Sequence, residues 1–94
     1  DISYENHLRE LSGPQESIQL SGREGRLLEV FLQNPDKVLQ RLVLLSRVWG
    51  SDAPVEESNL DTYVHFVRKR LKQVGSHVTI ETVRGIGYKL EKND

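Results

Sequence analysis

The 94-residue chain contains no cysteine and no methionine. Without cysteine it can form no disulfide framework, no Cys-ligated zinc site and no thiol nucleophile. Long apolar runs are also missing: the longest uncharged one is residues 42–45, far short of the roughly 20 residues that span a bilayer. No N-terminal signal peptide is visible. The sequence therefore permits an intracellular location.

The length fits one domain with one modest core. Leu, Ile, Val and Phe make up 29 of the 94 residues, well above the fraction of about 20% below which disorder is expected. The chain begins with Asp1 in place of an initiator methionine. We therefore expect a domain taken from a larger protein.

The net charge of −1 hides an asymmetry along the chain. Residues 1–60 carry 6 basic and 10 acidic side chains, whereas residues 61–94 carry 7 basic and 4 acidic ones. This segregation is a weak indication that the C-terminal third contacts something anionic. At this stage a solvated charged face explains it equally well.

Short apolar stretches at residues 2–4, 8–11 and 17–20 predict three strands, separated in part by a Gly-Pro turn at residues 12–15. Ser21 and Glu24 have the spacing of a capping box that starts a first helix, and Pro35 ends it. A second helix is expected from about Gln40 to Trp49, capped by Gly50. Its inward residues are predicted to be Leu44, Leu45, Val48 and Trp49, and its outward ones Arg41 and Arg47.

The clearest helical pattern begins at Ser58 or Asn59, either of which can act as N-cap, and runs to about Val74. One stripe is apolar and predicted to be core: Leu60, Val64, Val67 and Leu71. The opposite face holds Ser58, Thr62, His65, Phe66, Lys69 and Gln73. Asn59, Tyr63 and Arg70 flank one side of that face, and Arg68 and Lys72 flank the other. An exposed aromatic is thus expected among polar and cationic groups.

The chain ends in a predicted hairpin, with strands at residues 78–83 and 88–91. The turn between them contains Gly85 and Gly87, which are expected to supply positive φ angles, and Arg84 lies at its tip. A helix fits the major groove of DNA, and a narrow ribbon that carries arginine suits the minor groove.

These segments together resemble the winged-helix effector domain of OmpR/PhoB-type response regulators. The resemblance covers about residues 20–90 and rests on Leu-Ser-Gly-Arg-Glu at 20–24, Val-Trp-Gly at 48–50, Asp-Thr-Tyr-Val at 61–64, Arg-Lys-Arg-Leu at 68–71 and Thr-Val-Arg-Gly-Ile-Gly-Tyr at 82–88. The last motif after a basic helix is specific as a combination, although each piece alone is weak.

The resemblance implies an α+β fold, a winged helix-turn-helix in a single domain over residues 1–94. An N-terminal antiparallel sheet would occupy residues 1–20, three helices residues 21–75, and a C-terminal wing residues 77–91. It also implies four strands in the N-terminal sheet; we expect the fourth at Val38–Leu39 or within the opening residues. A receiver domain is expected upstream, outside this sequence.

The same resemblance implies sequence-specific binding of double-stranded DNA in the bacterial cytoplasm, with the helix at residues 58–74 in the major groove and the wing arginine in the minor groove. The expected DNA-binding residues are Ser58, Asn59, Thr62, Tyr63, His65, Phe66, Arg68, Lys69, Arg70, Thr82 and Arg84, with Arg41 and Trp49 near the phosphate backbone. The loop with Asp52, Glu56 and Glu57 is expected to contact RNA polymerase. Homodimers are expected to bind promoter direct repeats.

Three positions depart from the family pattern. Gly25 replaces an aromatic, which predicts thinner packing of the first helix. Gln40 replaces a serine cap, which leaves the start of the second helix less defined. Phe66 replaces a basic residue, and its ring suits a thymine methyl better than a guanine or a phosphate.

Parts of this pattern also fit other functions. A basic winged helix can instead dock an acidic protein partner, and Trp49 can serve as core packing in place of a DNA anchor. His7, His65 and His77 lack ligand spacing, so no metal and no cofactor are expected. No pair of acids has the arrangement that acid–base catalysis requires, which excludes an enzyme on this interpretation.

Overall fold

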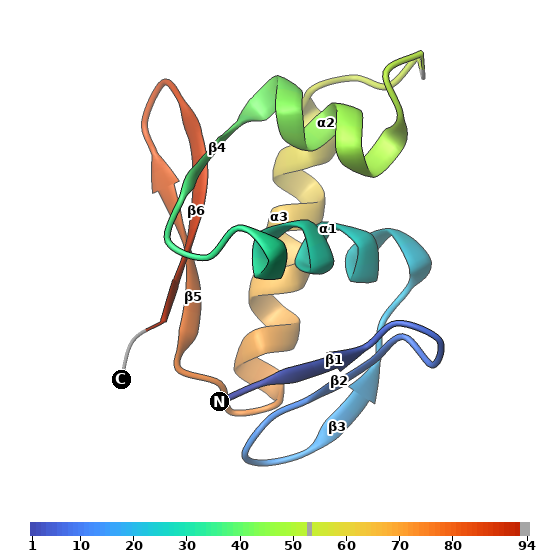
Figure 1. The fold of residues 1–94 in the computed structure, drawn as a ribbon, viewed down its shortest axis with the longest axis vertical. Coiled ribbons are helices and arrows are strands. Elements are labelled where there is room, and N and C mark those ends of the chain that lie inside the picture. Colours follow the sequence, from blue (N-terminus) through green and yellow to red (C-terminus); the bar gives the residue numbers. More distant parts are fainter. Residues whose placement is uncertain (53, 93–94) are drawn as a thin grey trace.

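The computed structural model describes residues 1–52 and 54–92, which form three helices and two antiparallel sheets (Figure 1). The strands are β1 (Ser3–Glu5), β2 (Glu10–Ser12), β3 (Ser17–Gln19), β4 (Val38–Gln40), β5 (Val78–Val83) and β6 (Gly87–Lys92); the helices are α1 (Gly22–Gln33), α2 (Arg41–Trp49) and α3 (Ser58–Gln73). This order confirms the predicted α+β winged-helix fold. Within the described ranges, no helix has the length and hydropathy of a membrane span.

The two sheets have three strands each, in the orders β1-β2-β3 and β4-β6-β5. The expectation of a fourth N-terminal strand is wrong for the described residues. A strand does form at Val38–Gln40, but it pairs with β6, placing Leu39 opposite Tyr88. Leu39 is buried there, so its apolar side chain joins the core through the wing sheet.

Helix α1 begins with the predicted capping box. The Ser21 hydroxyl accepts a hydrogen bond from the Glu24 amide at 3.2 Å, and the Glu24 carboxylate accepts one from the Ser21 amide at 2.9 Å. The predicted thinning of packing at Gly25 is wrong. The ring of Tyr4 in β1 fills the space, since a Cβ at Gly25 would collide with the Tyr4 hydroxyl.

Helix α2 starts without a side-chain cap at Gln40, as the departure from the family pattern predicts, and ends at Gly50 with φ of 94°. Of the four residues predicted to point inward, only Leu44 is fully buried and the other three are half-buried. Arg41 does not point outward as predicted. Its side chain donates hydrogen bonds to the carboxylates of Asp61, in α3, and of Glu57, the residue just before α3.

The predicted N-cap of α3 is wrong. Glu57 is the N-cap and has helical backbone angles, without a side-chain hydrogen bond. The side chain of Asn59 donates to the carbonyl of Glu56 at 3.2 Å, and the Thr62 hydroxyl donates to the carbonyl of Ser58 at 3.3 Å. The polar side chains of this first turn therefore bond backward to carbonyls and do not accept from free amides.

One core joins the helices to both sheets. Its fully buried side chains include the four residues of the predicted α3 stripe, which confirms the helix phase: Leu60, Val64, Val67 and Leu71. They pack with buried residues from every other layer: Leu11, Leu27, Leu28, Phe31, Leu44, Ile80 and Leu90. The core thereby holds α3 and the wing on a shared support.

The hairpin β5–β6 forms as predicted, with Val83 paired to Gly87. Its two glycines are required for different reasons. Gly85 has φ of 76° and fits the turn prediction, whereas Gly87 has no positive φ. Gly87 is required by close approach, because a Cβ there would collide with the carbonyl oxygen of Leu39 in β4.

Candidate nucleic-acid interface

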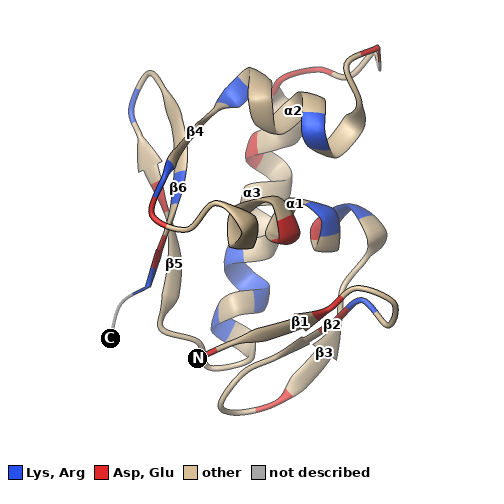
Figure 2. Cartoon of the chain, viewed as in Figure 1, with Lys and Arg blue, Asp and Glu red and all other residues tan. Residues whose placement is uncertain are grey.

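Helix α3 presents a polar face on the side opposite its buried stripe. The exposed residues of this face in the first three turns of α3 are Ser58, Thr62, His65, Phe66 and Lys69, with Asn59 exposed at its flank. Hydroxyl, amide, imidazole, aromatic and ammonium groups therefore lie within three turns. In Figure 2 the basic residues of α3 lie in its second half, and an acidic residue lies near its start.

Three aromatic rings form a row from α2 to this face. The ring centroids of Trp49 and Tyr63 are 5.4 Å apart, and those of Tyr63 and Phe66 are also 5.4 Å apart, both edge to face. The guanidinium of Arg23 lies 5.2 Å from the centre of the Trp49 ring. Trp49 and Tyr63 are half-buried, so packing holds them, while Phe66 is 39% exposed.

Replacing Phe66 with alanine is expected to cost about 1–2 kcal/mol of unfolding free energy, from one edge-to-face contact together with the partial burial of the ring. Full burial would make the cost about 3–5 kcal/mol. Urea denaturation of Phe66→Ala measures the difference, with Leu44→Ala as a fully buried control expected to lose about 2–5 kcal/mol. A Phe66→Ala loss as large as that of the control would show that the ring is a core residue.

Arg68 was expected among the DNA-contacting cations, but the structure turns its guanidinium toward the wing. Nε and Nη2 donate to the carbonyl of Ile80 at 2.9 and 2.7 Å, and Nη2 also donates to the Thr82 hydroxyl at 3.0 Å. The guanidinium also lies 5.5 Å from the centre of the Tyr88 ring. Arg68 and Thr82, predicted separately, thus bond to one another.

A second group of bonds joins the start of α3 to α2 and the wing. The Tyr88 hydroxyl donates to the Asp61 carboxylate, which also accepts from Arg41 at 2.7 and 2.9 Å. Arg41 donates as well to the carboxylate of Glu57. The bond from Arg41 lowers the pKa of Asp61, and the bond to Asp61 raises that of Arg41. Asp61 is therefore ionised at neutral pH and holds both donors.

Arg70 was also predicted as a DNA contact, and its Nε lies 3.4 Å from the carboxylate of buried Glu24 in α1. Lys69 and Lys72 are exposed, and their side chains make no hydrogen bond or ion pair with other described residues. The basic cluster of α3 therefore divides into two arginines with partners inside the domain and two lysines available to solvent.

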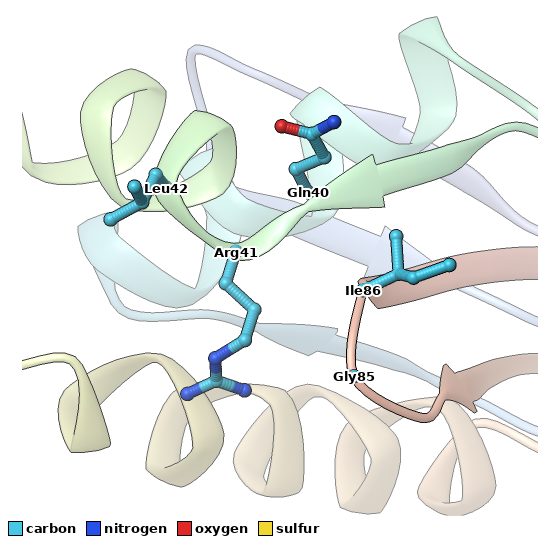
Figure 3. Close-up of a pocket in the computed structure, with 5 residues that line it drawn as sticks. All are labelled: Gln40, Arg41, Leu42, Gly85 and Ile86. Carbon is cyan, nitrogen blue, oxygen red and sulfur yellow. The ribbon is translucent and has the colours of Figure 1, made fainter.

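The wing turn carries Arg84 at its tip, where the residue is exposed. Its side chain makes no hydrogen bond or ion pair within the described part of the chain. Beside the turn, a pocket of about 290 Å³ lies between the wing and the start of α2, lined by Gln40, Arg41, Leu42, Gly85 and Ile86 (Figure 3). In that view the Arg41 side chain points from α2 toward the next helix.

The loop between α2 and α3 carries the three predicted acids. Asp52, Glu56 and Glu57 are all exposed, which leaves a negative edge next to the start of α3 (Figure 2). Of these three acids, only Glu57 has a side-chain partner among the described residues, the guanidinium of Arg41. Among residues 1–52 and 54–92, no cluster of three or more His, Asp or Glu side chains could hold a metal ion.

The sequence interpretation missed Asp61 and Tyr88 as members of this site. A signal for Asp61 existed, because it stands seven residues before Arg68 and therefore on the same helix face, two turns away. The inward alternation of Tyr88 and Leu90 in β6 could likewise have placed the Tyr88 ring against α3. The partners themselves lie 27 residues apart, too far for local pattern to show.

Comparison with known proteins places these features in a family. A family model described as "Transcriptional regulatory protein, C terminal" matches residues 15–90. Response regulator MprA of Mycobacterium avium is 37% identical over 92 residues, covering 98% of this chain and 40% of MprA. Heme response regulator HssR of Staphylococcus saprophyticus is 37% identical over 82 residues, covering 87% of this chain and 37% of HssR. The chain thus spans about two-fifths of these relatives.

A solved structure agrees with the same assignment. The DNA-binding domain of E. coli CadC superposes with a TM-score of 0.87 at 29% identity, over 98% of this chain and 87% of that one. The match includes the helices and the wing, since nearly the whole chain is covered.

Proposed function

The chain belongs to the family of transcriptional regulatory protein C-terminal domains, as an OmpR/PhoB-type member, and from this premise we propose that it binds promoter DNA as the effector domain of a response regulator. The family is one of transcription regulators, so the interpretation that the chain is no enzyme is confirmed. The proposal extends to how this chain's own residues meet the two grooves.

The observation that carries the proposal is the position of the wing turn relative to α3. The turn and the N-terminal half of α3 lie at the same end of the molecule (Figure 1), and Arg84 there has no partner within the described residues. The major groove admits a helix, and a narrow minor groove attracts arginine. We propose that α3 enters the major groove while Arg84 enters the adjacent minor groove.

Base reading falls to the exposed face of α3. Hydroxyl and amide groups of Ser58, Asn59 and Thr62 can bond base edges, and the Phe66 ring suits a thymine methyl. His65 adds a further polar contact. Lys69 is free to neutralise phosphate, and the half-buried Tyr63 and Trp49 offer a hydroxyl and an indole N–H at the rim.

Four residues that the sequence predicts to contact DNA have a different role in the proposal. Arg41, Arg68 and Arg70 already bond inside the domain, so we assign them to holding the interface in shape. The Thr82 hydroxyl accepts from Arg68 and keeps its own proton for a phosphate oxygen. None of these four residues contacts a base in the proposed complex.

Partners of the whole protein follow from the same family. The curated relatives are longer than this chain, and we propose a receiver domain in the intact protein, dimers on direct repeats and action in the bacterial cytoplasm. Asp52 and Glu56, exposed and without side-chain partners among the described residues, suit a basic surface of RNA polymerase. Glu57 is the less available acid, because Arg41 binds it.

Arg84→Ala is expected to weaken DNA binding about tenfold when the wing-side flank is A·T and less when it is G·C, because A·T tracts narrow the minor groove. The probes are duplexes selected from a random library by the wild-type protein and resynthesised with each flank. Four affinities at one salt concentration decide it, and Arg26→Ala, an equal charge change on α1, is the control.

Equal losses on both flanks would make Arg84 a general phosphate contact. No loss on either flank would remove the wing from the DNA surface. If the wild-type protein selects no duplex at all but binds an acidic polypeptide, the basic face docks a protein partner, and the DNA proposal fails.

A further inference from the structure

Two separate groups of contacts, called ties, join α3 to the wing, and each includes Tyr88. At the start of α3, Asp61 accepts the hydrogen bond of the Tyr88 hydroxyl. Two turns later, Arg68 bonds Ile80 and Thr82 of β5 and lies over the Tyr88 ring. Asp61 and Arg68 are about 10 Å apart along the helix axis, at 1.5 Å per residue.

Tyr88 connects both ties to the wing sheet, because it lies in the central strand of that sheet. It is 6% exposed and lies in the central strand β6, opposite Leu39 of β4 and Thr82 of β5. Arg41 at the start of α2 adds a third element, since its guanidinium bonds Asp61 and lies 6.0 Å from the Tyr88 ring centre. Burial raises the pKa of the Tyr88 hydroxyl, so it stays a donor at neutral pH.

Two anchor points fix more than one would. The core already holds the hairpin against α3, and two ties separated by two helical turns further restrict both its distance from α3 and its angle to α3. Arg84 lies two residues after Thr82, so a change of angle between the hairpin and α3 moves Arg84 relative to the exposed face of α3. Successive phosphates of one DNA strand are spaced by about 3.4 Å along the helix axis, so a shift of that size along the axis moves the tip by one base pair.

We propose that Asp61, Tyr88 and Arg68 are positioning residues that set the number of base pairs between the major-groove element read by α3 and the minor-groove element read by Arg84. This inference rests on the proposed function. The ligand is double-stranded DNA, and the property assigned is discrimination by spacing, in addition to discrimination by base. Arg68 acts in it through the wing, with Nε and Nη2 already bonded to wing residues.

The experiment uses the wild-type-selected duplex and two derivatives in which the A·T flank is moved by one and two base pairs. Tyr88→Phe removes the hydroxyl bond to Asp61 and keeps the buried ring. Arg68→Lys keeps the charge and loses the two-nitrogen grip on the Ile80 carbonyl. Arg26→Lys, on α1 and away from the wing, is the matched control. Thermal unfolding verifies that each variant is folded at the assay temperature.

The wild type and Arg26→Lys are expected to lose about tenfold or more in affinity when the flank moves by one base pair, the size of one wrong base pair. Tyr88→Phe and Arg68→Lys should bind the original duplex more weakly and lose less than about threefold on the shift. A purely structural role would lower affinity for all three duplexes by the same factor, and that result would overturn the inference.

Failure of the inference is distinguishable from failure of the proposed function. If the wild type selects no duplex from the library, the DNA proposal itself fails. If it selects one and the variants retain wild-type sensitivity to spacing, DNA binding stands and the positioning role is wrong. If one variant does not fold, the other still decides, because the two act at ties two turns apart.

Discussion

Gly87→Ala is expected to lower the free energy of unfolding by about 3 kcal/mol or more, the upper range for forcing an atom into a packed site. The added Cβ would collide with the carbonyl oxygen of Leu39, a backbone atom that cannot rotate away. Relief requires β4 to separate from β6, which breaks the pairing of Gln40 with Gly87 and exposes Leu39. Urea denaturation monitored by circular dichroism measures the loss.

The matched control is Gly85→Ala, two residues away in the turn that precedes β6. Gly85 has positive φ, but a Cβ there meets nothing within 4 Å. Its replacement should cost about 1–2 kcal/mol, the strain of a left-handed non-glycine residue. If Gly85→Ala proves as damaging as Gly87→Ala, backbone conformation and not the approach of β4 would explain the requirement for glycine at 87.

These glycines show where sequence pattern stops. Alternation and turn residues predict a hairpin at residues 78–91, because those signals are local. The role of Gly87 depends on Leu39, 48 positions earlier in the chain, so a pattern around residue 87 assigns it to the turn. The unexpected pairing of β4 with the wing and the role of Gly87 are therefore one feature of the fold.

The helices divide in the same way. The stripe of Leu60, Val64, Val67 and Leu71 follows from spacing alone, and the structure buries all four. The capping box at Ser21 is equally local. The N-cap of α3 was not predictable from residue type, because it lies at Glu57, before the predicted Ser58 or Asn59, and the Asn59 side chain bonds to the preceding carbonyl of Glu56.

The candidate site follows the same division, with consequences for function. The sequence places four cations in the second half of α3: Arg68, Lys69, Arg70 and Lys72. Their helical spacing predicts which of them point away from the core. It does not tell which of them find partners from other elements. In the structure Arg68 bonds to the wing and Arg70 pairs with Glu24 of α1. The side chains of Lys69 and Lys72 are exposed and have no partner among the described residues. A residue's charge is thus visible in sequence, whereas its availability depends on the fold.

Availability governs the expected salt dependence of DNA binding. Each phosphate that a cation neutralises releases condensed counterions, which contributes about −0.9 to the slope of log K against log salt. Lys69, Lys72 and Arg84 are free of internal partners within the described residues, and Arg47 is exposed at the end of α2. Phosphate contacts by four such cations would give a slope of about −3.6, and backbone amides and hydroxyls would add affinity without adding to the slope.

The wild-type protein is therefore expected to lose about a hundredfold in affinity for its selected duplex between 50 and 200 mM salt, with a slope steeper than about −3. Lys69→Ala and Arg84→Ala should each reduce the slope by about 1, because each removes one phosphate or groove contact. Arg70→Ala removes the same charge but a side chain that pairs with Glu24, so its slope should equal that of the wild type. Fluorescence anisotropy at five or more salt concentrations measures all four slopes. A flat wild-type response would reject DNA as the ligand of the basic face, and a reduced slope for Arg70→Ala would show that Arg70 leaves Glu24 to reach the DNA.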